Sequence, residues 1–276
     1  MTITFTRLTS SYVITKQYTT AGKQPAPPIS TATVERITAH NATGLADVLN
    51  QLTTKQVCMY GVFADAVTRT DSKNPALART NANTSWPTGG GVLMLDYDPP
   101  DGGEPLTLEQ LKAALQRIVP LDTIAHVCGY SSSSFIYNGD QQQAGSKGLR
   151  IYILVKDATD IPRAGKVLFD RLWLEGLGRI ELSKSAACLE RTLIDANVWQ
   201  PSRIDYASGA SCTPPMRQAR PAFAAYDGAY LDTQTALPDL TPEQAKRSAE
   251  IKAAAKHAVK PQATRVRGEY TTGRAK

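Results

Sequence analysis

The sequence predicts an α+β fold in which a mixed or mostly antiparallel central sheet is flanked by helices. Three observations lead to this class. Predicted strands occur in adjacent pairs separated by helices, in the order helix, strand, strand, helix, strand, strand, helix, strand. Two helix starts carry a capping box, Thr107 with Gln110 and Thr241 with Gln244. Hydrophobic residues make up 42% of the 276 residues, which is enough to build a core.

In the N-terminal part, the elements follow from turn residues and hydrophobic periodicity. Residues 1–33 are rich in Thr, Ser, Pro and Gln, so we expect an extension outside the core. A short edge strand is predicted near 34–37, a helix starts at Thr43, and 57–63 forms a strand. The polar segment 65–90 is long and irregular, which is typical of a functional or a mobile segment.

An apolar run after Gly91 predicts a buried strand that ends in Asp96-Tyr97-Asp98, before two prolines. Side chains alternate along a strand, so Asp96 and Asp98 point the same way, roughly 7 Å apart. Neighbouring carboxylates are stable as anions when cations lie between them, and Mg²⁺ is bound through one or two carboxylates plus substrate phosphates. The same pattern also fits an acidic, solvated turn.

Beyond this strand, capping and periodicity continue to define the elements. They are a helix from Thr107 to Pro120, a strand over 123–131, a strand over 149–155, a helix from Asp160 to Gly176, a strand over 191–195 and a terminal helix of about 17 residues from Thr241. The expected division of the chain is an N-terminal extension at 1–33, a core at 34–210, a linker at 211–240, and a helix with a basic, disordered tail at 241–276.

Bulk composition restricts the setting and the partners. The net charge of +6 fits an anionic partner without proving one. Four widely spaced cysteines indicate neither a zinc site nor a disulfide framework. We find no signal peptide and no apolar run near the ~20 residues that cross a bilayer, so we expect a cytoplasmic protein without a membrane partner.

Three groups of residues carry the side chains that phosphoryl transfer requires, namely metal-binding carboxylates and cationic phosphate donors. They are Asp96 with Asp98, the turn Ser146-Lys147-Gly148-Leu149-Arg150, and the lone carboxylate Asp195 after an apolar stretch.

On these motifs the chain resembles the archaeo-eukaryotic primase superfamily, the primase-polymerases often carried by plasmids and phages. That family's first motif, Asp-x-Asp on a strand, matches Asp96-Tyr97-Asp98, and its third, a hydrophobic residue before Asp, matches Ile194-Asp195. Its second motif is a Ser-x-His element. The corresponding stretch here runs from Ser146 to Tyr152 and has Arg150 where the His is expected. The resemblance covers roughly residues 34–210.

The resemblance implies an RRM-like primase-polymerase catalytic core and template-directed nucleotidyl transfer in the DNA replication of a mobile element. Two Mg²⁺ or Mn²⁺ ions would be held by three catalytic carboxylates, Asp96, Asp98 and Asp195. The nucleotide would be bound by Ser146, Lys147, Arg150 and Arg203. The implied partners are a single-stranded DNA template, an NTP or dNTP, and a replicative helicase that is either separate or fused.

Several alternatives stay open at this point. Asp205 competes with Asp195 as the third carboxylate. Arg150 is either a phosphate clamp without an acid–base role or an arginine paired with a nearby carboxylate. Ser146 and Lys147 also fit a plain polar turn, and Arg203 a plain surface arginine. At the level of function, the alternatives are a metal-dependent nuclease and a non-catalytic DNA-binding replication module.

Overall fold

A computed structural model of the chain describes residues 1–100 and 102–274. It confirms the predicted α+β class, because two antiparallel sheets are combined with several helices. The helices are α1 (Ala42–Gln51), α2 (Leu108–Gln116), α3 (Ile161–Leu174), α4 (Thr233–Ala236), α5 (Pro242–Ala258) and α6 (Lys260–Arg274), with 3₁₀ turns η1 (Ala158–Asp160) and η2 (Ala196–Val198).

The larger sheet has five strands in the order β16-β5-β1-β4-β7, all paired antiparallel. Their bounds are β16 (Ile204–Asp205), β5 (Gln56–Met59), β1 (Ile3–Thr9), β4 (Thr31–Ala39) and β7 (Arg69–Asp71). The central strand β1 pairs with β4 from Ile3 to Thr9.

The second sheet has four strands in the order β19-β10-β13-β9, again all antiparallel. Their bounds are β19 (Ala224–Tyr226), β10 (His126–Tyr130), β13 (Leu149–Val155) and β9 (Gly91–Tyr97). The unit β9-α2-β10 is a split β-α-β arrangement, since β13 is inserted between its two strands. Every residue of β13 is buried, as expected for a strand covered on both faces.

Smaller sheets surround these two. They are β12 (Gln141–Ala144), β11 (Ile136–Asn138) and β18 (Met216–Gln218); β17 (Ser211–Cys212), β2 (Gln17–Thr19) and β3 (Gly22–Gln24); the hairpin β14 (Arg179–Leu182) and β15 (Cys188–Arg191); and β6 (Val62–Phe63) with β8 (Thr84–Ser85).

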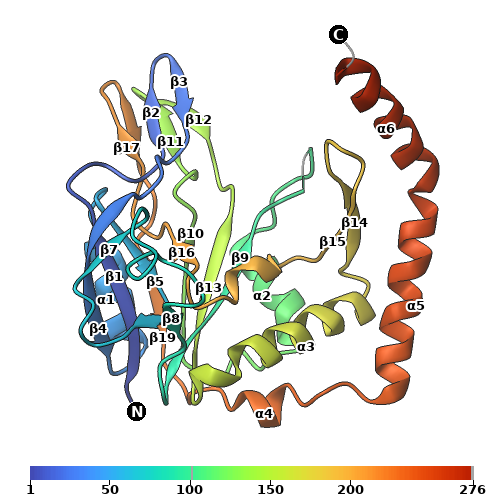
Figure 1. Cartoon of the computed structure of the whole chain (residues 1–276), viewed down its shortest axis with the longest axis horizontal. Helices are drawn as coiled ribbons and strands as arrows, with labels where there is room; N and C mark the ends of the chain where they lie inside the picture. The colour runs from blue at the N-terminus through green and yellow to red at the C-terminus, as the bar shows by residue number, and fades with distance from the viewer. Residues whose placement is uncertain (101, 275–276) are drawn as a thin grey trace.

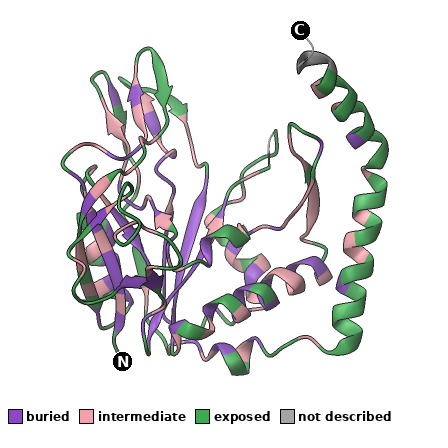
Figure 2. Ribbon diagram, in the orientation of Figure 1, coloured by how far each residue is buried: buried purple, intermediate pink, exposed green. Residues whose placement is uncertain are grey.

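The elements are arranged in layers. The five-stranded sheet lies on the left of Figure 1, the four-stranded sheet in the middle, α2 and α3 to its right, and α5 with α6 at the right-hand edge. Side chains of both sheets and of α1, α2 and α3 share one hydrophobic core. Figure 2 shows this core as buried strands in the centre, while α5 and α6 are mostly exposed.

Local sequence signals account for the helix boundaries. Both predicted capping boxes are present, at Thr107 and at Thr241, and α5 has the 17 residues expected for the terminal helix. After α3, Gly176 adopts φ +74°, a conformation that glycine takes without a steric penalty. These helices are confirmed because their signals lie within a few residues of each end.

The chain does not divide where the sequence suggested. Residues 1–33 are not an extension, because β1 is the middle strand of a sheet and buries Ile3, Phe5 and Leu8. Residues 211–240 are more than a linker, because β19 pairs with β10 in the four-stranded sheet. Residues 260–274 form α6 where a disordered tail was expected, whereas 275–276 lie outside the described residues. Strand pairing over long sequence separations decides the first two points, and local composition does not encode it.

Two of the predicted strands differ in the structure. The strand near 34–37 is not at an edge, because β4 lies between β1 and β7. The strand expected over 191–195 ends at Arg191, and Asp195 instead caps the 3₁₀ turn η2. The apolar residue Ile194 is buried without belonging to a sheet, so an apolar run before a carboxylate was not sufficient to predict a strand there.

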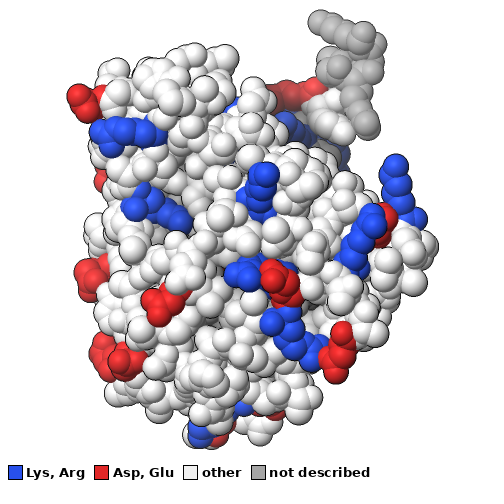
Figure 3. Space-filling view, turned by 90° about the vertical axis from the view of Figure 1, so that its left-hand side faces the viewer, with Lys and Arg blue, Asp and Glu red and all other residues white. Residues whose placement is uncertain are grey.

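One face of the molecule carries charged side chains of both signs (Figure 3). Figure 3 views the side that lies on the left of Figure 1, and on it basic and acidic side chains are interspersed. This face therefore offers no continuous basic surface within the described residues. Among those same residues, no helix has both the length and the apolar character to cross a membrane.

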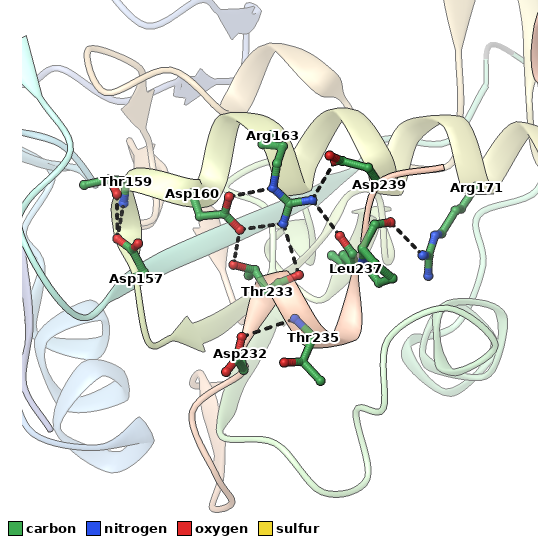
Figure 4. Close-up of polar contacts among 11 residues, drawn as sticks. Asp157, Thr159, Asp160, Arg163, Arg171, Asp232, Thr233, Thr235, Leu237 and Asp239 are labelled. Carbon is green, nitrogen blue, oxygen red and sulfur yellow. Dashed lines mark hydrogen bonds and ion pairs between the residues drawn. The ribbon is translucent and has the colours of Figure 1, made fainter. Parts of the chain in front are cut away.

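Between α3 and α4, a polar cluster joins the C-terminal segment to the body (Figure 4). Arg163 Nε and Nη2 donate to the two carboxylate oxygens of Asp160, each at 2.6 Å, and Nη1 donates to the carbonyl of Leu237 at 2.7 Å. The hydroxyl of Thr233 also donates to Asp160. The hydrogen bonds from Arg163 lower the pKa of Asp160, although partial burial opposes this effect.

We expect Asp160→Asn to lower the free energy of unfolding by roughly 1–3 kcal/mol at pH 7, because hydrogen bonds to a charged group are lost. A carboxylate whose pKa is depressed in the folded protein stabilises it above the unfolded pKa of about 3.9, and this contribution disappears as pH falls through the folded pKa. Urea unfolding at pH 7 and at pH 3 should therefore show a difference between wild type and variant that shrinks at the lower pH.

The exposed Asp47, on α1, supplies the control. Asp47→Asn should change the free energy of unfolding by less than about 0.5 kcal/mol at either pH. A wild-type advantage over Asp160→Asn that is as large at pH 3 as at pH 7 would contradict the assigned role of the ionised carboxylate.

Candidate functional site

The candidate site lies where β9 and β13 run side by side. In their antiparallel register Asp96 is directly opposite Arg150, and Tyr97 is opposite Leu149. Asp98 is the first residue beyond β9. The two strands therefore place the Asp-x-Asp motif beside the turn that leads into β13, residues 146–148.

Asp195 reaches the same strand end from a distant part of the chain. Its backbone N–H donates to the carbonyl of Asp96 at 2.9 Å. The turn η2 is fixed by Trp199, whose indole N–H donates to the carbonyl of Met94 at 2.9 Å and whose ring packs on Gly165 of α3. A Cβ at Gly165 would lie 2.4 Å from that ring, so only glycine fits there. The Asp195 carboxylate accepts from Asn197 through Oδ1, at 3.0 Å from its backbone N and 2.8 Å from its side chain.

The surroundings of Asp98 disfavour its ionised form. Burial raises its pKa, and the nearby charges of Asp96 and Asp195 raise it further, while Arg150 and Lys16 lower it. The three predicted carboxylates thus act on one another electrostatically, with Asp98 as the common member. A buried carboxylate with like charges beside it is stabilised as an anion by an added cation.

A loop of serines holds the turn beside Asp98. Ser131 Oγ accepts from the backbone N–H of Gly148 at 3.3 Å, and Ser134 Oγ accepts from that of Lys147 at 3.0 Å. A Cβ at Gly148 would lie 2.7 Å from Asp98 Oδ1, so glycine at this position lets the turn approach the carboxylate closely. Ser146 Oγ is buried and has no hydrogen-bond partner within the described residues. A buried hydroxyl without a partner is uncommon in folded proteins and is a feature that a bound ligand or ion can explain.

Arg150 lies at the centre of a buried ionic cluster. Nε donates to Asp96 Oδ1 at 3.3 Å, and Nη1 donates to Asp205 Oδ1. The other oxygen of Asp205 accepts from the hydroxyls of Tyr60, at 2.8 Å, and Tyr152, at 2.9 Å. The side chain of Asp205 is only 1% exposed and that of Arg150 10%.

The charge state of this cluster follows from its partners. Burial by itself would lower the pKa of Arg150, but the charges of Asp205 and Asp96 outweigh it and place the pKa well above its ordinary value. Burial raises the pKa of Asp205, whereas Arg150 and the two tyrosine hydroxyls lower it. Because a guanidinium does not deprotonate in proteins, we treat Arg150 and Asp205 as an ion pair.

The geometry therefore differs from one sequence expectation. Arg150 is paired with two carboxylates, which is the alternative that its sequence context left open, and it has no charge in excess for a phosphate clamp. Asp205, the rival for the third carboxylate, is occupied by Arg150, whereas Asp195 adjoins Asp96. Tyr152 lies two residues after Arg150 and on the same strand face, so strand periodicity alone could have linked these two residues.

Of the other predicted nucleotide-binding residues, two lie beside Asp98 and one does not. Ser146 and Lys147 lie in the turn beside Asp98, and the side chain of Lys147 is exposed. Arg203 is exposed before β16, and its charge acts on Arg79 and Tyr206. The structure thus brings two of the predicted nucleotide-binding residues next to the carboxylates, and it gives Arg203 other neighbours.

A cavity of about 300 Å³ opens next to the carboxylates. It is bounded by the loop after β9, the hairpin β14–β15 and the turn η2, and its lining includes Asp98, Asp195, Phe169, Arg179 and Arg191. The volume is at the lower end of the range for small-molecule pockets. Glu181 and Glu190 also line it; Arg191 pairs with Glu181 and Asp195, and Glu190 pairs with Lys252 and Lys256.

The oxygen atoms at this strand end suit Mg²⁺ or Mn²⁺ if a substrate supplies the remaining ligands. Within residues 1–100 and 102–274 no group of three or more His, Cys, Asp and Glu side chains forms a ready-made metal site. Carboxylate oxygens at the end of β9, a raised pKa at Asp98 and the unpaired hydroxyl of Ser146 nevertheless match an ion that is held by one or two carboxylates and completed by substrate phosphates.

The sequence reasoning missed Lys16, whose charge acts on Asp98. It lies in the segment that was expected to be an extension, and no sequence signal connects it to a strand end more than 80 residues away. The sequence also gave no sign that Asp205 pairs with Arg150, because that contact depends on how the two sheets meet.

Comparisons with protein-family models, with curated proteins and with solved structures gave no match. Function must therefore be inferred from the chemistry of the site.

Proposed function

We propose that the protein is a template-directed nucleotidyltransferase, a DNA primase or primase-polymerase that makes or extends primers on single-stranded DNA. The observation that carries this proposal is the convergence of Asp96, Asp98 and Asp195 on one strand end, beside a turn with Ser146 and Lys147. Their order along the chain is the order of the motifs in archaeo-eukaryotic primases, and the α+β fold with its split β-α-β unit is compatible with such a core.

In this proposal each residue has a defined task. Asp98, with Asp96 and Asp195, would hold Mg²⁺ or Mn²⁺, which supply charge neutralisation on the triphosphate and a lowered pKa for the attacking 3′-hydroxyl. The Ser146 hydroxyl donates a hydrogen bond to a phosphate oxygen, and the exposed ammonium of Lys147 attracts the triphosphate. Arg150 keeps Asp96 oriented at the strand end.

The direct test is primer synthesis with the purified chain. With single-stranded template, all four NTPs or dNTPs and Mn²⁺ or Mg²⁺, we expect a labelled product longer than the input. Product should disappear with excess chelator and return when Mn²⁺ is added back. Failure to form product with either nucleotide set and either metal refutes the proposal.

The same reactions separate the two alternatives. A metal-dependent nuclease would shorten labelled single-stranded DNA in Mg²⁺ without nucleotides. A non-catalytic DNA-binding module would make no product and would bind DNA equally well in chelator. A replicative helicase, separate or fused, is the expected partner of a primase, and its addition should increase product only if the chain itself synthesises primers.

A further inference from the structure

The pairing of Arg150 raises the question of which cation meets the substrate. A nucleoside triphosphate carries several negative charges, and phosphoryl-transfer sites need cationic donors for them. Arg150 lies between Asp96 and Asp205, so its charge is already balanced within the protein. Besides Lys147, the structure contains a further cation whose charge acts on Asp98, and it lies outside the region that resembles primases.

That cation is Lys16, which immediately precedes β2. Its ammonium donates to Ser133 Oγ at 2.8 Å, and the backbone N–H of Ser133 donates to Ser131 Oγ at 3.4 Å. Ser131 in turn accepts from Gly148, the glycine that lies against Asp98. A continuous series of contacts thus joins Lys16 to the turn beside the carboxylate motif.

The backbone around Lys16 is held firmly. Its carbonyl accepts from the N–H of Ser211, at 2.9 Å, where β17 pairs with β2. Two residues earlier Ile14 is fully buried, and its N–H donates to the carbonyl of Thr54 at 3.0 Å. The lysine therefore projects from a fixed support, which limits the entropy lost when its side chain binds a ligand.

The electrostatics agree with a ligand-binding role. Burial lowers the pKa of Lys16, and the charges of Lys23 and Arg150 lower it further, while Asp98 and Asp96 raise it. Within the described residues its one hydrogen-bond acceptor is Ser133, so two of the three ammonium donors remain for a ligand. A phosphate oxygen there would supply the negative charge that a half-buried lysine lacks.

We propose that Lys16 is a substrate-binding residue of this site, and that its ammonium contacts the phosphates of the incoming nucleoside triphosphate. The inference rests on the proposed function for the identity of the substrate, but its geometry requires only a metal-bound polyphosphate. It makes the N-terminal segment part of the site and gives it the phosphate-binding task that the sequence suggested for Arg150.

Protection from chemical modification tests the contact without relying on activity. The full chain is treated with an amine-acetylating reagent, in Mn²⁺ with and without a non-hydrolysable nucleoside triphosphate, and labelling is measured by mass spectrometry. At ten times the Kd of the nucleotide, acetylation of Lys16 should slow by about tenfold. Lys55, an exposed lysine in the turn between α1 and β5, should be labelled at the same rate in both samples.

Kinetics supply the second measurement. Lys16→Met should raise the KM for nucleotide by roughly tenfold or more, because a charge-assisted hydrogen bond is lost, and the KM for template should not change. Lys16→Arg, which keeps the charge, should lie between this variant and wild type. Lys55→Met should match wild type, and melting temperatures will show whether each variant is folded.

The outcomes separate the two proposals. An active wild type with unprotected Lys16, or a Lys16→Met variant with an unchanged KM and only a lower kcat, overturns the role of Lys16. An inactive wild type in which Lys16 is nonetheless protected refutes nucleotidyl transfer and leaves Lys16 as a polyphosphate-binding residue. If the wild type is inactive and Lys16 is unprotected, both proposals fail.

Discussion

Replacing Asp98 by asparagine is expected to lower kcat for nucleotidyl transfer by roughly 10²- to 10³-fold or more, since the loss of a metal-binding carboxylate removes several kcal/mol of charge stabilisation from the transition state. Asp98 is the site carboxylate on which the charges of Asp96 and Asp195 both act. Its substitution should therefore affect the site more than the loss of any exposed acid nearby.

The same substitution should leave the fold intact. Burial and like charges raise the pKa of Asp98, so the folded protein disfavours its ionised form. Asparagine removes that unfavourable charge, and Asp98→Asn should be at least as stable as the wild type in urea. Activity lost without stability lost is the combination that distinguishes a functional carboxylate from a structural one.

Steady-state primer extension in Mn²⁺, with urea unfolding of the same preparations, measures both quantities. Glu104→Gln is the matched control, because Glu104 is an exposed acid in the loop that follows the motif. It should retain wild-type kcat. An Asp98→Asn variant with kcat within a factor of two of wild type would show that Asp98 is not a metal-binding carboxylate of the site.

The largest effect on stability is expected from Asp205→Asn. This carboxylate is 1% exposed and pairs with Arg150, which is itself buried. Removing one member of a buried ion pair leaves the other insufficiently compensated, at a cost of about 3–5 kcal/mol. Because Asp96 still accepts a hydrogen bond from Arg150 in this variant, we expect a loss of stability at the lower end of that range.

Asp140 provides a matched control for this substitution. It pairs with Arg217 at 3.5 Å but is fully exposed, and Asp140→Asn should leave the urea midpoint close to that of wild type. The double variant Arg150→Met with Asp205→Asn should be more stable than the sum of the single changes implies, because neither Arg150 nor Asp205 is then left buried without the other, and Asp96 loses Arg150 in the Arg150→Met single variant and in the double variant alike. Equal urea midpoints for Asp205→Asn and Asp140→Asn would show that the buried pair contributes no more than a surface pair.

Where the decisive interactions are local, the sequence was a good guide to the fold. Capping residues Thr107 and Thr241 and the terminating Gly176 lie next to the helices that they delimit, so their effect does not depend on the rest of the chain. The alternation of faces along β9 likewise placed Asp96 and Asp98 at one strand end. These signals determined the α+β class and drew attention to the carboxylate motif.

The sequence by itself determined the helices that capping residues delimit, the strand that carries the carboxylate motif, and which side chains could carry phosphate chemistry. The tertiary structure alone decided that β1 is a central strand, that Arg150 is balanced by Asp205 and Asp96, and that Lys16 lies beside the site. The physical reason is that these contacts join residues far apart in the chain. Their energies come from burial and from charges that meet only when the sheets and loops have assembled.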